Sequence, residues 1–434
     1  MIQLKRTDAT FEREPLGRPF GFKGGYLSEI WQSVVRLEDD QGTVGWGTGC
    51  QSVLWSEPRL FQRESEAGGN SEMFALTDQA LTLARELTWE SPIDLLAQLL
   101  PDMMRRAQSL TAMDDLRQTF LLNALVPIDL AAWMLYARRH GVDSFDAMVP
   151  EVYKPALSAR HSKLASIPVS SWNMPVSELE SMTRNEGVFM VKFKLGAPGD
   201  QKQMLERDKQ RLGEVHRAVG DLPAEEATTG EFQYYLDLNG RYESKERVQR
   251  LLDHADSIGA LEQILLLEEP FPESLLEDVS DLGVRVAADE SAHSVRDVAE
   301  RISLGYGAIA LKPIAKTLSM TLEMALEAHK AGVACFCADL TVNPLLTDWN
   351  KCVAARLPAI PGLETGLIEV NGHQNYRDWA RMQSYHPVPD APWQQVREGC
   401  YHLGEAFYEK SGGVLEDSEH YLGLFPGLQE DGPE

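Results

Sequence analysis

The chain has 434 residues, 43% of them hydrophobic, which is enough for a large buried core and for more than one ordinary domain. It carries 41 Lys and Arg against 66 Asp and Glu, a formal net charge of -25, so nucleic acid is not expected as a partner. The five cysteines are scattered and suggest neither a disulfide framework nor a zinc site. The sequence shows no signal-peptide pattern and no apolar stretch of about 18 residues, so we expect a cytoplasmic protein without a membrane partner.

The first part of the chain has the pattern of an α+β domain. Residues 30–37 alternate apolar and polar side chains, turn residues follow at 39–42, and a returning strand follows at 43–49, which predicts a β-hairpin. From about residue 72 to residue 141, apolar residues recur at three- and four-residue spacing, which predicts helices. We therefore expect an N-terminal α+β capping domain over residues 1–150.

From about residue 165, eight short apolar strands alternate with amphipathic helical stretches. The strand sequences are IPVSSW, VFMVKFKL, YYLDLN, ILLLEE, VRVAADE, GAIALK, VACFCAD and GLIEV. This α/β alternation predicts a (β/α)8-type barrel, a modified TIM barrel, over residues 151–372. An open doubly wound sheet is the alternative, but no Gly-x-Gly-x-x-Gly follows any of these strands.

Two other segments are less regular. Residues 221–233 are polar and longer than a typical loop, so we expect a surface insertion there. Residues 373–434 contain an amphipathic region around 396–408 and end in an acidic tail rich in Gly and Pro. We expect this C-terminal segment to pack back onto the capping domain and its tail to be frayed.

Charged residues stand at the ends of several predicted strands. Lys192 and Lys194 end one strand, and Asp237, Glu268 and Asp289 end the next three. Because a barrel delivers the C-terminal ends of its strands to one face, these groups should meet there. Three carboxylates suit Mg²⁺ and leave room for a substrate carboxylate, whose α-proton a lysine could then remove if its pKa falls. The alternative is a set of ordinary charged residues on the rim of the barrel.

Seven motifs stand out along the chain: VVRLEDDQGTVGWGTG and NALVPIDLAAWML in the first domain, and VKFKLG, LDLNGRY, LEEPFPE, AADES and IALKP in the barrel. In this order they resemble the enolase superfamily, of the muconate-lactonizing enzyme and mandelate racemase-like kind, and within it the muconate-lactonizing, dipeptide-epimerase and o-succinylbenzoate-synthase group. The resemblance covers nearly the whole chain.

The resemblance implies a role for each matching residue. Lys194 would be one acid/base, Lys192 its electrostatic companion, and Lys312 the opposing acid/base. The metal, Mg²⁺ with Mn²⁺ as the alternative, would be held by three carboxylates: Asp237, Glu268 and Asp289. Asn239 and Glu290 would support these ligands from behind, and Glu269 would point away from them.

The chain also departs from the family pattern. Relatives commonly place two glycines shortly after the sixth-strand lysine, whereas this chain continues 313–318 as PIAKTL. No histidine lies on the seventh strand, so a His-Asp dyad of the mandelate-racemase kind is not expected. The Asp-x-Asp of dipeptide epimerases is replaced by residues 367–370, which disfavours a dipeptide substrate.

Substrate contacts are expected from the capping domain and from the later strand ends. Residues 21–26 contain three glycines and predict a lid that offers Phe22, Lys23 and Tyr26. Asp339 and His373 follow the seventh and eighth strands and are further candidates. His293 is expected to be an exposed loop residue.

The expected activity is abstraction of the proton α to a carboxylate through an enediolate, with a small carboxylate as substrate. Racemisation or epimerisation, cycloisomerisation and syn-dehydration, including an o-succinylbenzoate-synthase-like reaction, all remain open. A non-catalytic barrel relative that acts as a binding protein is the alternative from a different class. The resemblance also implies a homo-oligomer, because relatives are commonly dimers or octamers.

Overall fold

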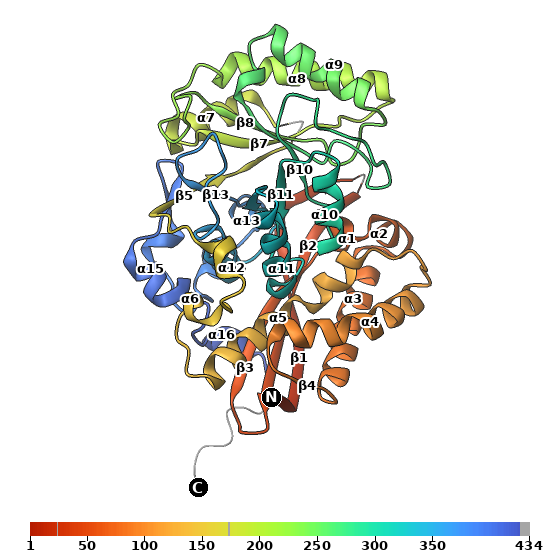
Figure 1. Cartoon of the computed structure of the whole chain (residues 1–434), viewed down its shortest axis with the longest axis vertical. Helices are drawn as coiled ribbons and strands as arrows, with labels where there is room; N and C mark the ends of the chain where they lie inside the picture. The colour runs from red at the N-terminus through yellow and green to blue at the C-terminus, as the bar shows by residue number, and fades with distance from the viewer. Residues whose placement is uncertain (24, 172–173, 426–434) are drawn as a thin grey trace.

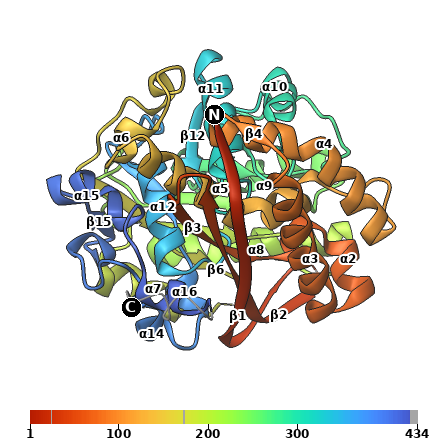
Figure 2. The same cartoon turned by 90° about the horizontal axis from the view of Figure 1, so that it is seen from below.

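The computed structural model describes residues 1–23, 25–171 and 174–425. It contains a four-stranded sheet near the N-terminus and a larger sheet formed by later residues. Figure 1 shows the larger sheet and its helices above the N-terminal sheet, and Figure 2 shows the N-terminal sheet and its helices from below. The α/β barrel with an α+β cap that the sequence predicts is confirmed.

The N-terminal sheet has the strand order β3-β2-β1-β4. Its strands are β1 (Ile2–Phe22), β2 (Gly25–Asp39), β3 (Val44–Gln51) and β4 (Thr88–Trp89). The predicted hairpin is β2 and β3. The sequence analysis missed β1, whose charged residues break the apolar alternation. Cross-strand pairing holds it instead, because it pairs with β2 from Leu4 to Phe22, interrupted by two register shifts.

Six helices follow β3, and β4 lies between the third and the fourth of them. They are α1 (Val53–Ser56), α2 (Pro58–Glu64), α3 (Glu66–Ala84), α4 (Pro92–Thr111), α5 (Gln118–Arg139) and α6 (Phe145–Met148), with a 3₁₀ turn at Lys154–Leu157. Helix α5 is apolar and long enough to cross a membrane, but 94% of its apolar window is buried inside the protein. It is the core helix of the cap.

A row of glycines lets α5 lie directly against β3. Gly45, Gly47 and Gly49 share one face of the strand because side chains alternate along it. A Cβ atom on Gly47 would lie 2.5 Å from the backbone nitrogen of Ala131 and 2.5 Å from the carbonyl oxygen of Pro127. The backbones of β3 and α5 are therefore in direct contact. Moving α5 away to make room for a side chain would disrupt the packing of this helix.

Gly47→Ala should lower the free energy of unfolding by roughly 1–3 kcal/mol, because the added methyl group overpacks a backbone contact. Urea denaturation measures this. The matched control is Gly423→Ala, an exposed position near the C-terminus where a Cβ atom meets nothing within 4 Å. Equal stability of the two variants would contradict the close packing of α5 on β3.

The barrel has eight parallel strand positions, the first of which is split. They are β5 (Lys163–Ile167) with β6 (Val169–Ser170), β7 (Met190–Lys194), β8 (Gln233–Asp237), β9 (Ile264–Glu268), β10 (Val286–Ala288), β11 (Ala308–Leu311), β12 (Ala334–Cys337) and β13 (Gly366–Glu369). Strand β5 pairs with β13, whereas β6 pairs with β7. The break falls at Pro168, and the sheet closes into a barrel through this split strand.

Most of these strands are followed by a helix. The helices are α7 (Val176–Glu186), α8 (Gln201–Val219), α9 (Lys245–Ser257), α10 (Val295–Ser303), α11 (Leu318–Lys330) and α12 (Pro344–Ala354), with a 3₁₀ turn at Leu261–Gln263. The expected alternation fails between β9 and β10, where residues 269–285 form no helix. Pro270 and Pro272 lie at the start of this connection and disfavour one.

The polar segment 221–233 is exposed over much of its length, as expected of a surface insertion, but part of it is buried. Ala224 and Ala227 are buried in a core cluster together with Ile167 and Leu265 of the barrel. Ala227 also forms a bridge to Leu363 ahead of β13. The segment therefore fills the end of the barrel where the strands begin, a contact between distant residues that local polarity does not reveal.

The C-terminal segment contacts both the cap and the barrel. It contains α13 (Gly372–Asn375), α14 (Trp379–Gln383), β14 (Val396–Arg397), β15 (Cys400–His402), α15 (Glu405–Lys410) and α16 (Glu419–Gly423), with 3₁₀ turns at Pro392–Gln394 and Ser411–Gly413. On the cap, the Trp46 indole donates to Asp417 at 3.0 Å. On the barrel, β15 pairs antiparallel with β5. The expected frayed tail, residues 426–434, lies outside the described residues.

Asp129 of α5 joins the cap to the barrel. Its carboxylate accepts hydrogen bonds from the backbone N–H groups of Leu318 (2.8 Å) and Ser319 (3.2 Å) at the start of α11, and from the Ser319 hydroxyl. Trp133 donates to the same hydroxyl at 3.0 Å. The cap thereby supplies an N-terminal cap for a barrel helix. Burial raises the pKa of Asp129 to about 7, although these hydrogen bonds oppose the rise.

This raised pKa predicts a pH dependence of stability. The folded protein keeps Asp129 protonated up to about pH 7, whereas the unfolded chain ionises it near the ordinary aspartate pKa of 3.8. The contribution to stability is therefore complete below that value and is lost as the pH rises to about 7. Asp129→Asn cannot ionise, so between pH 5 and pH 7.5 it should lose roughly 1–3 kcal/mol less than the wild type. Urea unfolding at both pH values measures this, and parallel losses in the two proteins would contradict it.

Candidate active site

The charged residues predicted at the strand ends converge at one end of the barrel. Lys192 and Lys194 lie on β7, Asp237 ends β8, and Glu268 ends β9. Asp289 directly follows β10, and Lys312 directly follows β11. Glu369, which the sequence analysis did not select, ends β13 in the same group.

Lys192 lies at the centre of a buried charge cluster. Its Nζ is 3.0 Å from Asp237, 2.9 Å from Glu268 and 3.1 Å from Glu369. Burial alone would favour the neutral amine, but these carboxylates raise the pKa of Lys192 well above its usual value. The side chain is therefore a fixed ammonium inside the barrel mouth.

Lys194 lies beside Lys192 but faces outward to a cleft. It forms an ion pair with Asp237, its neighbour in the β7–β8 register. The side chain of Lys194 is 20% exposed to solvent, whereas that of Lys192 is 2% exposed. Burial raises the pKa of Asp237, but the two lysines outweigh this effect and lower it to about 2. Of the two strand-end lysines, Lys194 is the one that a bound molecule could reach.

Lys312 reaches the site from the end of β11, whereas Lys192 and Lys194 reach it from β7. Its Nζ is 2.6 Å from Asp289 Oδ2 and lies 4.5 Å from the ring centre of Trp55 in the cap. Burial lowers the pKa of Lys312, but Asp289 more than offsets this, so the net shift is upward. Lys312 is therefore an ammonium in this arrangement.

Lys316 is a second cation on Asp289 that the sequence analysis missed. It is fully buried and donates to the Asp289 carbonyl at 2.7 Å, with its Nζ 3.4 Å from the carboxylate. Although burial opposes this, Lys312 and Lys316 hold the pKa of Asp289 well below its usual range. The only sequence signal for Lys316 is its position four residues after Lys312, in a loop that differs from the family pattern.

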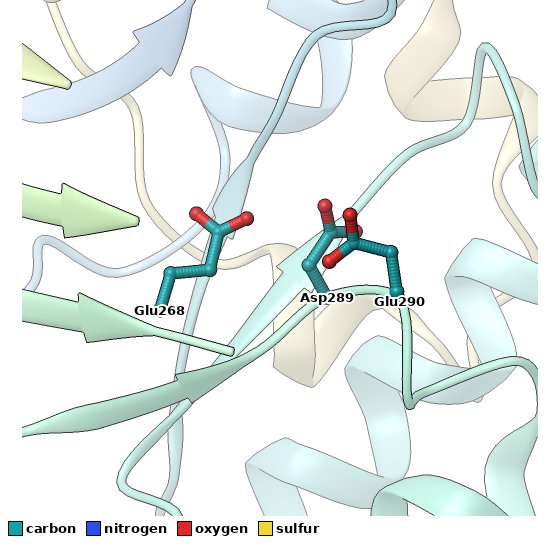
Figure 3. A group of neighbouring side chains, drawn as sticks. All are labelled: Glu268, Asp289 and Glu290. Carbon is teal, nitrogen blue, oxygen red and sulfur yellow. The ribbon is translucent and has the colours of Figure 1, made fainter. Parts of the chain in front are cut away.

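Three carboxylates form a compact group that could hold a metal ion (Figure 3). Oxygen atoms of Glu268, Asp289 and Glu290 all lie within 4.8 Å of one another, and all three side chains are buried. Asp237, predicted as a ligand, is outside this group and is paired with lysines. Glu290, predicted only to support the ligands, is inside it.

The donor set fits a hard divalent cation. Glu290 Oε2 is buried without a hydrogen-bond partner, and an orphaned carboxylate oxygen of this kind can serve as a ligand. Burial, and then the nearby charge of Asp237, raise the pKa of Glu268 well above its usual value, so added positive charge would stabilise its ionised form. Glu269 is turned to the N–H group of Asp289 at 2.8 Å and the Ser291 hydroxyl at 3.0 Å.

Asn239 and the cap surround Glu290. The side-chain amide of Asn239 donates to Glu290 at 3.5 Å, and the backbone N–H of Asn239 donates to Asp237 at 2.9 Å. From the tip of the β1–β2 hairpin, Lys23 Nζ lies 3.0 Å from Glu290 and donates to the carbonyl of Trp55 at 3.3 Å. The predicted lid therefore reaches the acid group itself.

The other lid candidates lie farther out. Phe22 lines the cavity at the barrel mouth, whereas Tyr26 is 70% exposed and lines only the outer cleft. Gly24 of the predicted lid lies outside the described residues.

Of the three remaining candidates, Asp339, His373 and His293, only Asp339 lines the inner cavity. Asp339 lines the inner cavity, but its carboxylate accepts from the N–H groups of Leu340 (2.7 Å) and Asn371 (2.6 Å), and burial raises its pKa to about 7. His373 is exposed, packs edge-on to Trp379 at 6.3 Å between ring centres, and does not line the described cavities. His293 is buried rather than exposed and contacts Glu273.

Two connected spaces lie at the barrel mouth. The inner cavity has a volume of about 40 Å³ and is lined by Lys194, Asp289, Glu290 and Lys312 among others. The outer cleft, of about 550 Å³, lies between the hairpin tip and the β7 and β8 ends. Lys194 and Asn239 line both spaces.

A family profile described as enolase C-terminal domain-like matches residues 176–398, which is just over half of the chain. This chain belongs to the enolase superfamily. The match covers the strands that carry Lys192, Asp237, Glu268, Asp289 and Lys312. Among curated protein sequences, none matches the chain significantly.

Solved enolase-superfamily structures resemble most of the chain at low sequence identity. A mandelate racemase/muconate lactonizing protein from Herpetosiphon aurantiacus is 17% identical with a TM-score of 0.63, over 93% of this chain and 96% of that chain. An N-succinyl Arg/Lys racemase from Bacillus cereus is 17% identical with a TM-score of 0.60, over 87% and 88%. A dipeptide epimerase from Enterococcus faecalis, solved with Mg and L-Leu-L-Tyr, is 16% identical with a TM-score of 0.58, over 84% and 92%. These similarities establish the superfamily fold, and a specific reaction does not follow from them.

Asp289→Asn should weaken Mg²⁺ binding at least about tenfold, because a charged ligand becomes neutral in a buried site. Isothermal titration calorimetry measures this. Asp339→Asn is the matched control, since Asp339 lines the same cavity but its carboxylate is already engaged by backbone N–H groups. Unchanged affinity in the Asp289 variant would remove Asp289 from the metal site.

The third ligand can be decided by the same titration. A large loss in Glu290→Gln with little loss in Asp237→Asn would support the compact group seen in the structure. The reverse result would support the set that the sequence predicts.

Proposed function

We propose that this enolase-superfamily chain is a Mg²⁺-dependent enzyme that removes the proton α to a carboxylate of a small acid. The observation that carries the proposal is the shared cavity: Lys194 and Lys312 line the same small space as Asp289 and Glu290. A carboxylate held at the acid group would have an amine from β7 and an amine from β11 within the same enclosure. This is the arrangement that proton removal and return require.

The metal would be held by Glu268 and Asp289, with Asp237 or Glu290 as the third carboxylate. A bound Mg²⁺ would supply positive charge that stabilises the negative charge building up on the substrate carboxylate. Support comes from the orphaned oxygen of Glu290 and from the Mg in the similar dipeptide epimerase structure. Mn²⁺ prefers similar oxygen ligands and is the alternative.

The lysines would carry out the proton transfers. Lys194 is the partly exposed amine and would take the α-proton from one face of the substrate. Lys312, an ammonium through its contact with Asp289, would return a proton from the other face or stabilise negative charge there. Lys192 remains a buried ammonium and would hold Asp237 and Glu268 in place beside Lys194 through its ion pairs.

Racemisation or epimerisation uses both lysines as acid and base. Syn-dehydration and cycloisomerisation need one lysine as the base and the other only as a cation. The two cases predict different behaviour of single-lysine variants.

In D₂O with Mg²⁺, the wild type should exchange the α-hydrogen of a member of a carboxylate library, detected by NMR or mass spectrometry. Lys194→Ala should reduce this exchange roughly 10²- to 10⁴-fold, the usual contribution of a general base. For a racemase, Lys194→Ala and Lys312→Ala should each cause a loss of this size for a different enantiomer. For a dehydratase or cycloisomerase, Lys194→Ala alone should cause it.

The matched control is Lys330→Ala, which removes an exposed lysine at the end of α11 and should leave exchange unchanged. Absence of exchange with every acid, despite bound Mg²⁺, would sink the proposal and favour a binding protein.

A further inference from the structure

The inner cavity, of about 40 Å³, is far smaller than the usual ligand pocket. The outer cleft of about 550 Å³ adjoins it and is within the usual size range of ligand pockets. Phe20 and Phe22 line both spaces, as do Lys194 and Asn239. The remainder of a reacting acid would therefore extend into the outer cleft.

The outer cleft is cationic, although the chain as a whole is strongly acidic. Its described lining includes four cationic side chains and one carboxylate, in a chain with 41 basic and 66 acidic residues. The cations are Arg18, Lys23, Lys194 and Arg241, and the carboxylate is Glu178. This local reversal of charge favours an anionic group in the cleft.

Most of these cations already have a carboxylate partner. Lys23 is paired with Glu290 and Lys194 with Asp237, and Arg18 lies 3.8 Å from Glu178. Among the residues that the structure describes, the guanidinium of Arg241 forms no ion pair or hydrogen bond. It is the cation of the cleft that remains available to a ligand.

The position of Arg241 is fixed although its charged group is free. Its N–H donates to the carbonyl of Leu238 at 3.0 Å, and its own carbonyl accepts from the Gln201 amide at 2.8 Å. Its aliphatic stem lies over Gly196, where a Cβ atom would be 2.7 Å from Arg241 Cγ. Gly196 lies two residues after Lys194, so the stem of Arg241 is held against the segment that carries Lys194, at the wall of the outer cleft. A fixed stem reduces the entropy lost when a ligand binds.

Asp208 is a carboxylate whose pKa is influenced by Arg241, but it already accepts hydrogen bonds from other groups. Asp208 accepts from the N–H groups of Gly196 (2.9 Å) and Ala197 (3.1 Å) and from the Tyr242 hydroxyl (2.8 Å). The pKa of Asp208 is raised by burial, and Arg241 is only a minor opposing influence. Asp208 therefore forms no ion pair with the guanidinium of Arg241.

The rest of the cleft wall is largely apolar. Phe20, Phe22, Val169 and Met174 line it together with the cations. Methylene groups of a ligand would be favourable beside these side chains. One free guanidinium matches one additional carboxylate, which it can bind through two parallel N–H···O contacts.

We infer that the substrate is a dicarboxylic acid. One carboxylate is the reacting group at the acid cluster, an apolar linker crosses the outer cleft, and the second carboxylate binds Arg241, with a smaller contribution from Arg18. This inference rests on the proposed function for the identity of the reacting end. It adds a recognition residue and a substrate class.

The test is calorimetric binding to the Mg²⁺-loaded protein, with acids matched in carbon number. Adipate is compared with hexanoate, and suberate with octanoate. At least one diacid should bind about tenfold more tightly than its monoacid, as expected for one additional charge-assisted contact. Arg241→Met keeps the stem and removes the charge, so it should abolish this preference and leave monoacid binding unchanged. Arg18→Met should reduce the preference by a smaller factor, because Arg18 is 67% exposed and already near Glu178.

Arg250→Met, an exposed position on α9 away from the cleft lining, is the matched control and should retain the preference. Two results would overturn the inference: diacids that bind no more tightly than monoacids in the wild type, including no binding by either, or an Arg241 variant that weakens both classes equally.

Failure of the inference is distinguishable from failure of the proposed function. If α-hydrogen exchange occurs but diacids have no advantage, only the inference fails. If diacids bind through Arg241 but no acid exchanges its α-hydrogen, only the proposed chemistry fails.

Discussion

The site depends on the mutual neutralisation of charges that the barrel buries. A single buried carboxylate or ammonium costs several kcal/mol of desolvation, so each charged group at the mouth lies against opposite charges or hydrogen-bond donors. Lys192 serves three carboxylates, and Asp289 is held by two lysines from the β11 end. Removing one partner would leave another group buried and unpaired. The geometry of the mouth is therefore set by electrostatics as much as by the strands that deliver the residues.

The cap completes this arrangement and determines which molecules can enter. Asp129 fixes the start of α11, just after the loop that carries Lys312 and Lys316. Lys23 neutralises Glu290, and Trp55 lies over Lys312. Movement of the hairpin tip would therefore alter both access to the outer cleft and the charge balance of the acid group. Chemistry and selection are thus assigned to different parts of the fold, the strand ends for the former and the cleft wall for the latter.

The sequence predicted the eight barrel strands because each is short, apolar and bounded by turn residues. It also predicted Lys192, Lys194, Asp237, Glu268, Asp289 and Lys312 at one mouth, because parallel strands place their C-terminal ends on the same face. Their catalytic and metal-binding roles remain predictions. Strand β1 was missed because its stability comes from pairing with β2 rather than from its own pattern. The segment 221–233 was predicted only in part, because its polar composition does not reveal that two of its alanines fill the base of the barrel.

The sequence by itself determined the class of fold, the superfamily and the strand ends at which the charged groups stand. These are local properties: the period of apolar residues and the placement of short motifs. Only the tertiary structure decided that Glu290 joins Glu268 and Asp289, that Lys316 is buried against Asp289, and that Arg241 lies free in a cationic cleft. Each of these depends on side chains from several elements meeting in three dimensions, where distance and desolvation choose the partners.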